Sequence, residues 1–91
     1  MTIYITAVHM EPADASDHQH IAQVMWTEPT KGEINYSSRE AVVDWLTKGG
    51  DARVRDSHGE VSVGVVNDDP PYIRTHADGR HTDNLLSLPR Y

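Results

Sequence analysis

The sequence predicts an α+β fold, in which a small antiparallel sheet of short strands has one helix packed on one face. Three observations predict it. Only the segment that follows Ser37 spaces its apolar residues as a helix does, whereas the segments on either side alternate with the period of strands. Turn signals such as Asp78-Gly79 separate the strand-like runs. The expected order along the chain is therefore three strands, one helix and four further strands.

The first three strands come from the N-terminal third. Residues 3–8 place apolar side chains on both faces of an alternating pattern, which indicates a strand in the middle of the sheet. A polar loop follows over 11–17, and a second strand is expected over 21–27. The turn signal at 29–32 then returns the chain as a short third strand over 33–36.

The helix has its own start and stop signals. Ser37 stands three residues before Glu40, which is the spacing of a capping box. Gly49-Gly50 can supply the left-handed residue that ends the helix. The apolar residues that share one helical face are Val42, Val43, Trp45 and Leu46. This pattern predicts one amphipathic helix that packs on the sheet.

Four short strands are expected after the helix. Residues 52–55 and 61–66 predict a hairpin, and Gly64 between its valines indicates a bulge or a close approach. A closing hairpin is expected around Asp78-Gly79, with its second strand over 82–88 completing the sheet. The apolar end of the chain should dock against the core. Residues 1–91 are interpreted as a single domain.

Composition excludes several classes of function. The 91 residues include no cysteine, so a disulfide, a thiolate zinc site and a cysteine nucleophile are all excluded. The net charge is −6, and residues 1–30 hold four of the acidic groups without any lysine or arginine. Such a chain gains no electrostatic attraction to phosphate backbones or to anionic lipid. No apolar run approaches a membrane span and no basic leader is present, so a cytoplasmic protein is expected.

Several landmarks resemble a known family. They are YITAV at 4–8, VMWT at 24–27, VDW at 43–45, GGDA at 49–52 and DNLLSLP at 83–89. In this order they are similar to the DUF3892 family, a domain of unknown function found in bacteria and their phages. The resemblance covers nearly the whole chain. It implies a one-domain protein of bacterial or phage origin, and it supplies no agreed activity, substrate or cofactor.

The first functional hypothesis is a non-catalytic interaction module. No nucleophile elbow, phosphate-binding loop or dinucleotide fingerprint occurs, so neither an enzymatic activity nor a cofactor is expected. The module would bind a protein partner or a second copy of itself, through sheet edges or through the acidic loop over 11–20, and would exist as a monomer or homodimer. For a phage protein, the partner would by analogy be a host protein. The expected contact residues are Glu11, Asp14, Asp17, His18, His20 and Trp26.

Two alternatives belong to other classes. The first is a small-ligand or metal site on the closing hairpin, where imidazoles and carboxylates could ligate a divalent cation: His76, Asp78, His81 and Asp83. The favoured explanation of these residues is structural: His76 and His81 fill aromatic-like positions beside a turn, and Asp78 is there for its turn propensity. The second is single-stranded nucleic-acid binding through Arg53, Arg55 and Tyr72, against which the net acidity argues.

Overall fold

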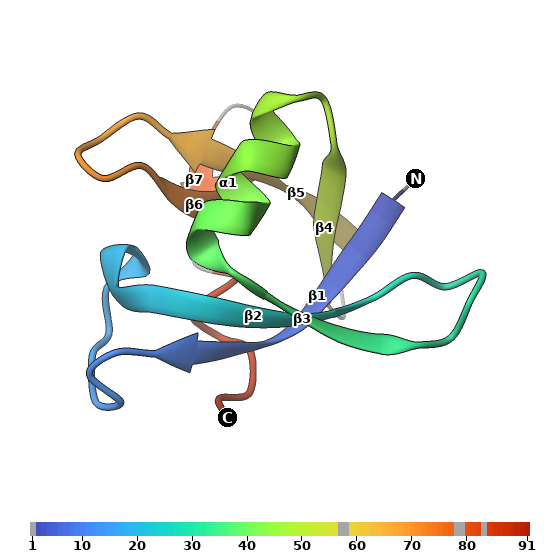
Figure 1. Cartoon of the computed structure of the whole chain (residues 1–91), viewed down its shortest axis with the longest axis horizontal. Helices are drawn as coiled ribbons and strands as arrows, with labels where there is room; N and C mark the ends of the chain where they lie inside the picture. The colour runs from blue at the N-terminus through green and yellow to red at the C-terminus, as the bar shows by residue number, and fades with distance from the viewer. Residues whose placement is uncertain (1, 57–58, 78–79, 83) are drawn as a thin grey trace.

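The computed structural model describes residues 2–56, 59–77, 80–82 and 84–91 (Figure 1). Its α+β fold and the expected order of elements are confirmed. The elements are β1 (Thr2–Met10), the 3-10 turn η1 (His18–His20), β2 (Ile21–Thr27), β3 (Ile34–Ser38), α1 (Arg39–Thr47), β4 (Asp51–Asp56), β5 (Gly59–Val66), β6 (Tyr72–Ala77) and β7 (Arg80–Thr82). No helix within the described residues is both long and apolar enough to cross a membrane.

The sheet has seven strands in the order β3-β2-β1-β4-β5-β6-β7. As expected, β1 lies inside the sheet, between β2 and β4. All neighbouring strands are antiparallel except β1 and β4, which are parallel over Thr2–Tyr4 and Asp51–Arg53. The parallel pair arises because α1 carries the chain from the edge strand β3 back across the sheet to β4. In Figure 1, α1 lies across one face of the sheet and contacts β2, β3, β5 and β6.

Two register shifts in β1 change which of its side chains face the core. They lie between Ile5 and Ala7 and between His9 and Met10. Because a shift of one residue changes which side chains face the core, Ala7 and Val8 are both buried although they are adjacent. The second half of β1 leaves β4 and pairs at Val8 with Arg90 near the end of the chain.

The core is aliphatic and lies between α1, the sheet and the C-terminal segment. Its buried members are Ile3, Ile5, Val8, Met10, Ile21, Val24, Val42, Ala52, Val54, Val63, Ile73 and Leu85. Trp26 and Trp45 are partly buried and pack against this cluster.

The helix begins one residue later than the capping-box spacing predicts. Ser38 is the N-cap, and its Oγ accepts a hydrogen bond of 3.1 Å from the Ala41 N–H. Ser37 lies one residue earlier in β3, opposite Val24, and its Oγ accepts a hydrogen bond from the Trp26 Nε1–H. The helix end is as expected, because Gly49 has φ +99° and its N–H donates to the Leu46 carbonyl.

The expected strand over 82–88 is wrong for residues 84–88. Residues 84–88 form turns, with hydrogen bonds from Ser87 N to Asn84 O and from Leu88 N to Leu85 O. The expected docking of the end of the chain is nevertheless confirmed. Leu85 is fully buried, and Val8 exchanges two backbone hydrogen bonds with Pro89 and Tyr91. The apolar run therefore fills the core as a turn and does not extend the sheet as a strand.

Candidate functional site

The edge of the sheet at β3 exposes two large apolar side chains. Ile34 is 65% exposed and Tyr36 is 58% exposed. They alternate along β3 and share one face, opposite the face on which Ser37 points towards α1. On its outer side β3 pairs with no other strand of the described chain. An edge with free backbone groups and exposed apolar side chains is typical of a surface that accepts a further strand.

Tyr91 extends this surface. Its ring centroid lies 5.5 Å from that of Tyr36, in an edge-to-face arrangement, and 5.6 Å from that of His9. His9 Nδ1 lies 2.6 Å from the Tyr91 carbonyl oxygen, which fixes the end of the chain beside β1. Partial burial raises the pKa of the Tyr91 phenol, and the nearby Tyr36 adds to the effect. Ile34, Tyr36 and Tyr91 are called the edge patch below.

The acidic loop is exposed but is held at its base. The carboxylates of Glu11, Asp14 and Asp17 are at the surface. The Glu11 N–H donates to the His20 carbonyl at 3.0 Å, and Arg90 donates to the Ala13 carbonyl at 3.3 Å. The structure therefore presents three carboxylates on a loop whose two ends are tied together.

The expected contact residues do not form one surface. His18 is buried, with 7% of its surface exposed, whereas His20 is half-buried and its Nδ1 lies 3.5 Å from Asp17. Trp26 lies near the far end of β2, where it packs under α1 and not beside the loop. In the sequence, the loop residues were selected by charge and Trp26 by its aromatic ring. The strand register shows that Trp26 lies at a distance from the loop.

Arg53 and Arg55 share one face of β4, as the nucleic-acid alternative requires, but acidic groups surround them. Arg53 lies 3.3 Å from Asp51, and both arginines lie within 3.4 Å of Glu60. Tyr4 donates to Glu60 at 2.9 Å, and this bond, followed by Arg55, holds the pKa of the Glu60 carboxyl below its usual value. The two positive charges are thus balanced by two carboxylates.

An aromatic ring does accompany these arginines, although it is not the expected one. The Arg55 guanidinium carbon lies 3.8 Å from the centre of the Tyr4 ring, whereas Tyr72 lies on β6, two strands from β4. Sequence reasoning missed Tyr4 because its position depends on the parallel pairing of β1 with β4, which places Tyr4 beside Arg53.

The metal alternative lies mostly outside the described residues. His76 and His81 are opposite one another in the β6–β7 register. The His76 ring packs over Gly64, where an added Cβ would lie 3.0 Å from Cε1, so the expected close approach at Gly64 is confirmed. Asp78, Asp83 and the His81 side chain fall outside the described part of the chain. Within that part, no three histidine or carboxylate side chains gather as a metal site.

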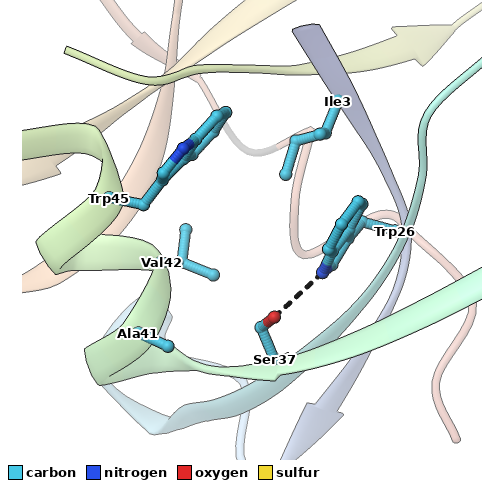
Figure 2. A pocket seen from close by; sticks show the side chains of 6 residues that line it. All are labelled: Ile3, Trp26, Ser37, Ala41, Val42 and Trp45. Carbon is cyan, nitrogen blue, oxygen red and sulfur yellow. Dashed lines mark hydrogen bonds between the residues drawn. The ribbon is translucent and has the colours of Figure 1, made fainter. Parts of the chain in front are cut away.

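A pocket opens between α1 and the sheet (Figure 2). Its volume is about 230 Å³. Figure 2 shows the rings of Trp26 and Trp45 on opposite sides of it. The Trp26 Nε1–H donates to Ser37 Oγ at 2.9 Å. The lining residues are Ile3, Trp26, Ser37, Ala41, Val42 and Trp45. Sequence reasoning missed this pocket, since it is formed by four elements whose packing no local pattern specifies.

The comparisons with known proteins agree with the landmark residues. A family model described as "Protein of unknown function (DUF3892)" matches residues 4–89. The chain belongs to the DUF3892 family. The match runs from Tyr4 in β1 to Pro89, so it includes at least part of every strand of the sheet and the turn that buries Leu85. No curated protein and no solved structure matches this DUF3892 protein.

Proposed function

We propose that this DUF3892 domain is a non-catalytic interaction module, which binds a strand of a protein partner or of a second copy of itself along the edge of β3. The observation that carries the proposal is the edge patch. Ile34 and Tyr36 are the two most exposed large apolar side chains among the described residues, and both lie on an edge strand. A solvent-exposed apolar pair at this position is otherwise a liability for aggregation.

Strand addition would use both the free backbone groups of the β3 edge and its exposed apolar side chains. The outward N–H and C=O groups of β3 would continue the hydrogen-bond ladder, which gives binding that depends little on sequence. Ile34, Tyr36 and Tyr91 would supply apolar contact on one face, and fully burying a side chain of this size contributes about 1.5–3 kcal/mol. Backbone pairing would set the register, and the edge patch would favour a partner strand with apolar residues at alternate positions.

The acidic loop would contribute charge rather than apolar contact. Glu11, Asp14 and Asp17 are exposed on a loop tied at its base, so they can attract a basic partner without a folding step. Replacing Asp14 and Asp17 with Ser should then slow association and reduce its salt dependence, with the fold intact. Unchanged capture of a partner by this double variant would remove the loop from the proposal.

The edge is tested with a charged substitution and a matched control. Tyr36→Lys places a solvated charge on the β3 edge, whereas Ser62→Lys places the same charge at an exposed site on β5, which is paired on both sides. Sedimentation velocity over a range of concentrations measures self-association, and selection from a library of extended peptides measures strand capture. We expect association or capture in the wild type and in Ser62→Lys, and its loss in Tyr36→Lys with an unchanged circular dichroism spectrum. Equal behaviour of the two lysine variants, or no binding by the wild type in either assay, would overturn the proposal.

A further inference from the structure

We propose that the pocket between α1 and the sheet is a binding site for one small, neutral, bicyclic aromatic molecule (Figure 2). The pocket lies on the face covered by the helix, whereas Ile34 and Tyr36 of the edge patch point to the opposite face. The two sites share no lining residue. The inference is therefore independent of the proposed function, and either can fail without the other.

The walls of the pocket favour an aromatic ring. Trp26 and Trp45 face the space from β2 and α1, and indole rings pack well against another ring in stacked or edge-to-face arrangements. Ile3 and Val42, which are both 3% exposed, contribute an aliphatic surface that belongs to the core. A ring inserted between the two indoles would exchange contact with water for contact with apolar atoms on several sides.

Both indole rings are already fixed in place. The Trp26 ring is held by its hydrogen bond to Ser37 Oγ. The Trp45 ring lies against Gly50, where it occupies the space that a Cβ would need. Binding to a preformed pocket avoids the cost of ordering its side chains, so a weakly interacting small molecule can still be retained.

The volume sets the size of the ligand. An engineered apolar protein cavity of about 150 Å³ binds benzene. The pocket here measures about 230 Å³, which leaves room for a second fused ring. Sites for drug-sized ligands begin at about 300 Å³, so a nucleotide or a flavin would not fit.

The polar content sets the chemistry of the ligand. None of the six lining side chains is ionisable, so a charged ligand would lose its hydration without gaining a partner. Ser37 supplies the one hydroxyl of the lining. Its oxygen accepts from Trp26, which leaves the hydroxyl hydrogen able to donate to a ligand. A neutral ring system with one hydrogen-bond acceptor is the best match.

The tryptophans of the chain can serve as spectroscopic probes of this site. It has two tryptophans, and both line the pocket. Their two indole N–H signals in a ¹⁵N–¹H correlation spectrum therefore report directly on occupancy. Quinoline is a suitable ligand at pH 7.5, since it is bicyclic, neutral and has one acceptor nitrogen. We expect saturable shifts of both indole signals with a Kd on the order of 0.1 mM, and contacts between quinoline protons and the Val42 methyl groups.

Two substitutions in α1 separate the pocket from non-specific adsorption. Ala41→Leu fills the pocket from an exposed helical position, whereas Thr47→Leu adds the same side chain to an exposed position of the helix outside it. We expect quinoline to bind at least tenfold more weakly to Ala41→Leu and equally to Thr47→Leu. Ser37→Ala should remove any preference for quinoline over naphthalene, which has no acceptor.

Two results would overturn the inference. One is the absence of saturable indole shifts in the wild type up to the solubility limit of quinoline. The other is equal binding to wild type and Ala41→Leu, which would place the probe elsewhere. If Ala41→Leu does not fold, the contacts between quinoline and Val42 in the wild type decide the question, because their absence rejects the site without any variant.

Discussion

The indole ring of Trp45 occupies the space that a Cβ atom at Gly50 would need. Gly50 is thus required for steric reasons. The preceding residue, Gly49, is required for a different reason. Its φ is +99°, a backbone conformation that residues with a side chain rarely adopt, whereas an added Cβ there would meet no atom within 4 Å. Two adjacent glycines therefore end α1 and position Trp45 by separate physical effects.

We expect Gly50→Ala to displace the Trp45 ring and to destabilise the fold by about 1–3 kcal/mol, which is the usual cost of overpacking. Chemical denaturation measures the stability, and the Trp45 indole N–H signal reports the position of the ring. The matched variant is Gly49→Ala, which should cost about 1 kcal/mol through backbone strain and leave the indole signal in place. If the indole signal shifts equally in both variants, steric contact is not the role of Gly50.

Ser37 and Ser38 should have separable roles. Ser38→Ala removes the N-cap acceptor of the Ala41 N–H, and we expect a loss of about 0.5–2 kcal/mol of stability with little change at Trp26. Ser37→Ala removes the acceptor of the Trp26 Nε1–H, and we expect a shift of that indole signal. Thermal unfolding and ¹⁵N–¹H spectra of the two variants measure both effects. The opposite result, with Ser37→Ala weakening the helix more, would restore the capping-box interpretation.

The contribution of the Asp51 carboxylate to the stability of the fold should be lost at low pH. The Thr2 hydroxyl donates to Asp51 at 2.8 Å and lowers the pKa of its carboxyl below the ordinary 3.8, and Arg53 lowers it further. A carboxyl with a lowered folded-state pKa binds fewer protons in the folded state than in the unfolded state. Its stabilisation is therefore present above pH 3.8 and is lost as the pH falls through the folded-state pKa.

Asp51→Asn tests this dependence. We expect the variant to be less stable than the wild type at pH 7, and the difference to shrink as the pH falls below about 4. Urea unfolding at pH values from 7 to 2.5 measures it, with Asp14→Asn in the exposed loop as the control. A difference that stays constant across this range would show that the loss at residue 51 is not due to its charge.

Leu85 should be the most costly truncation in the C-terminal segment. It is fully buried within a turn, whereas the next residue, Leu86, is only partly buried. We expect Leu85→Ala to lower the free energy of unfolding by about 2–5 kcal/mol and Leu86→Ala to lower it by less. Equilibrium denaturation measures both. Equal costs would contradict the finding that Leu85, and not Leu86, is the core residue of this turn.

Features that depend on local pattern were predictable from the sequence. The strand at Ile21–Thr27 and the end of the helix at Gly49 follow from alternation and from turn chemistry. The helix start was wrong by one residue because Ser37 and Ser38 are both good N-caps. The side-chain partners decide between them, since Ser38 Oγ accepts from the Ala41 N–H whereas Ser37 Oγ accepts from Trp26.

Features that join distant segments were not predictable. The parallel pairing of Tyr4 with Arg53 determines the arginine cluster, and the crossover of α1 determines the pocket between Trp26 and Trp45. Neither the parallel pairing nor the crossover produces a periodic pattern in the sequence, because each depends on how two distant elements pack. The edge patch is a similar case, since Ile34 looks like any strand residue until the strand order shows β3 at the edge.

The pairing of Val8 with Arg90 has a consequence for how the chain is made. β2 and β3 can cover one side of β1 as soon as they leave the ribosome, but the other side near Val8 must wait for residues 89–91. At about 5–20 residues per second, that wait is on the order of 10 s. Throughout this interval the edge of β1 near Val8 has no pairing partner in the nascent chain. Synthesis is thus a stage at which this edge of β1 can mispair with a neighbouring chain, in addition to the β3 edge that the finished fold exposes.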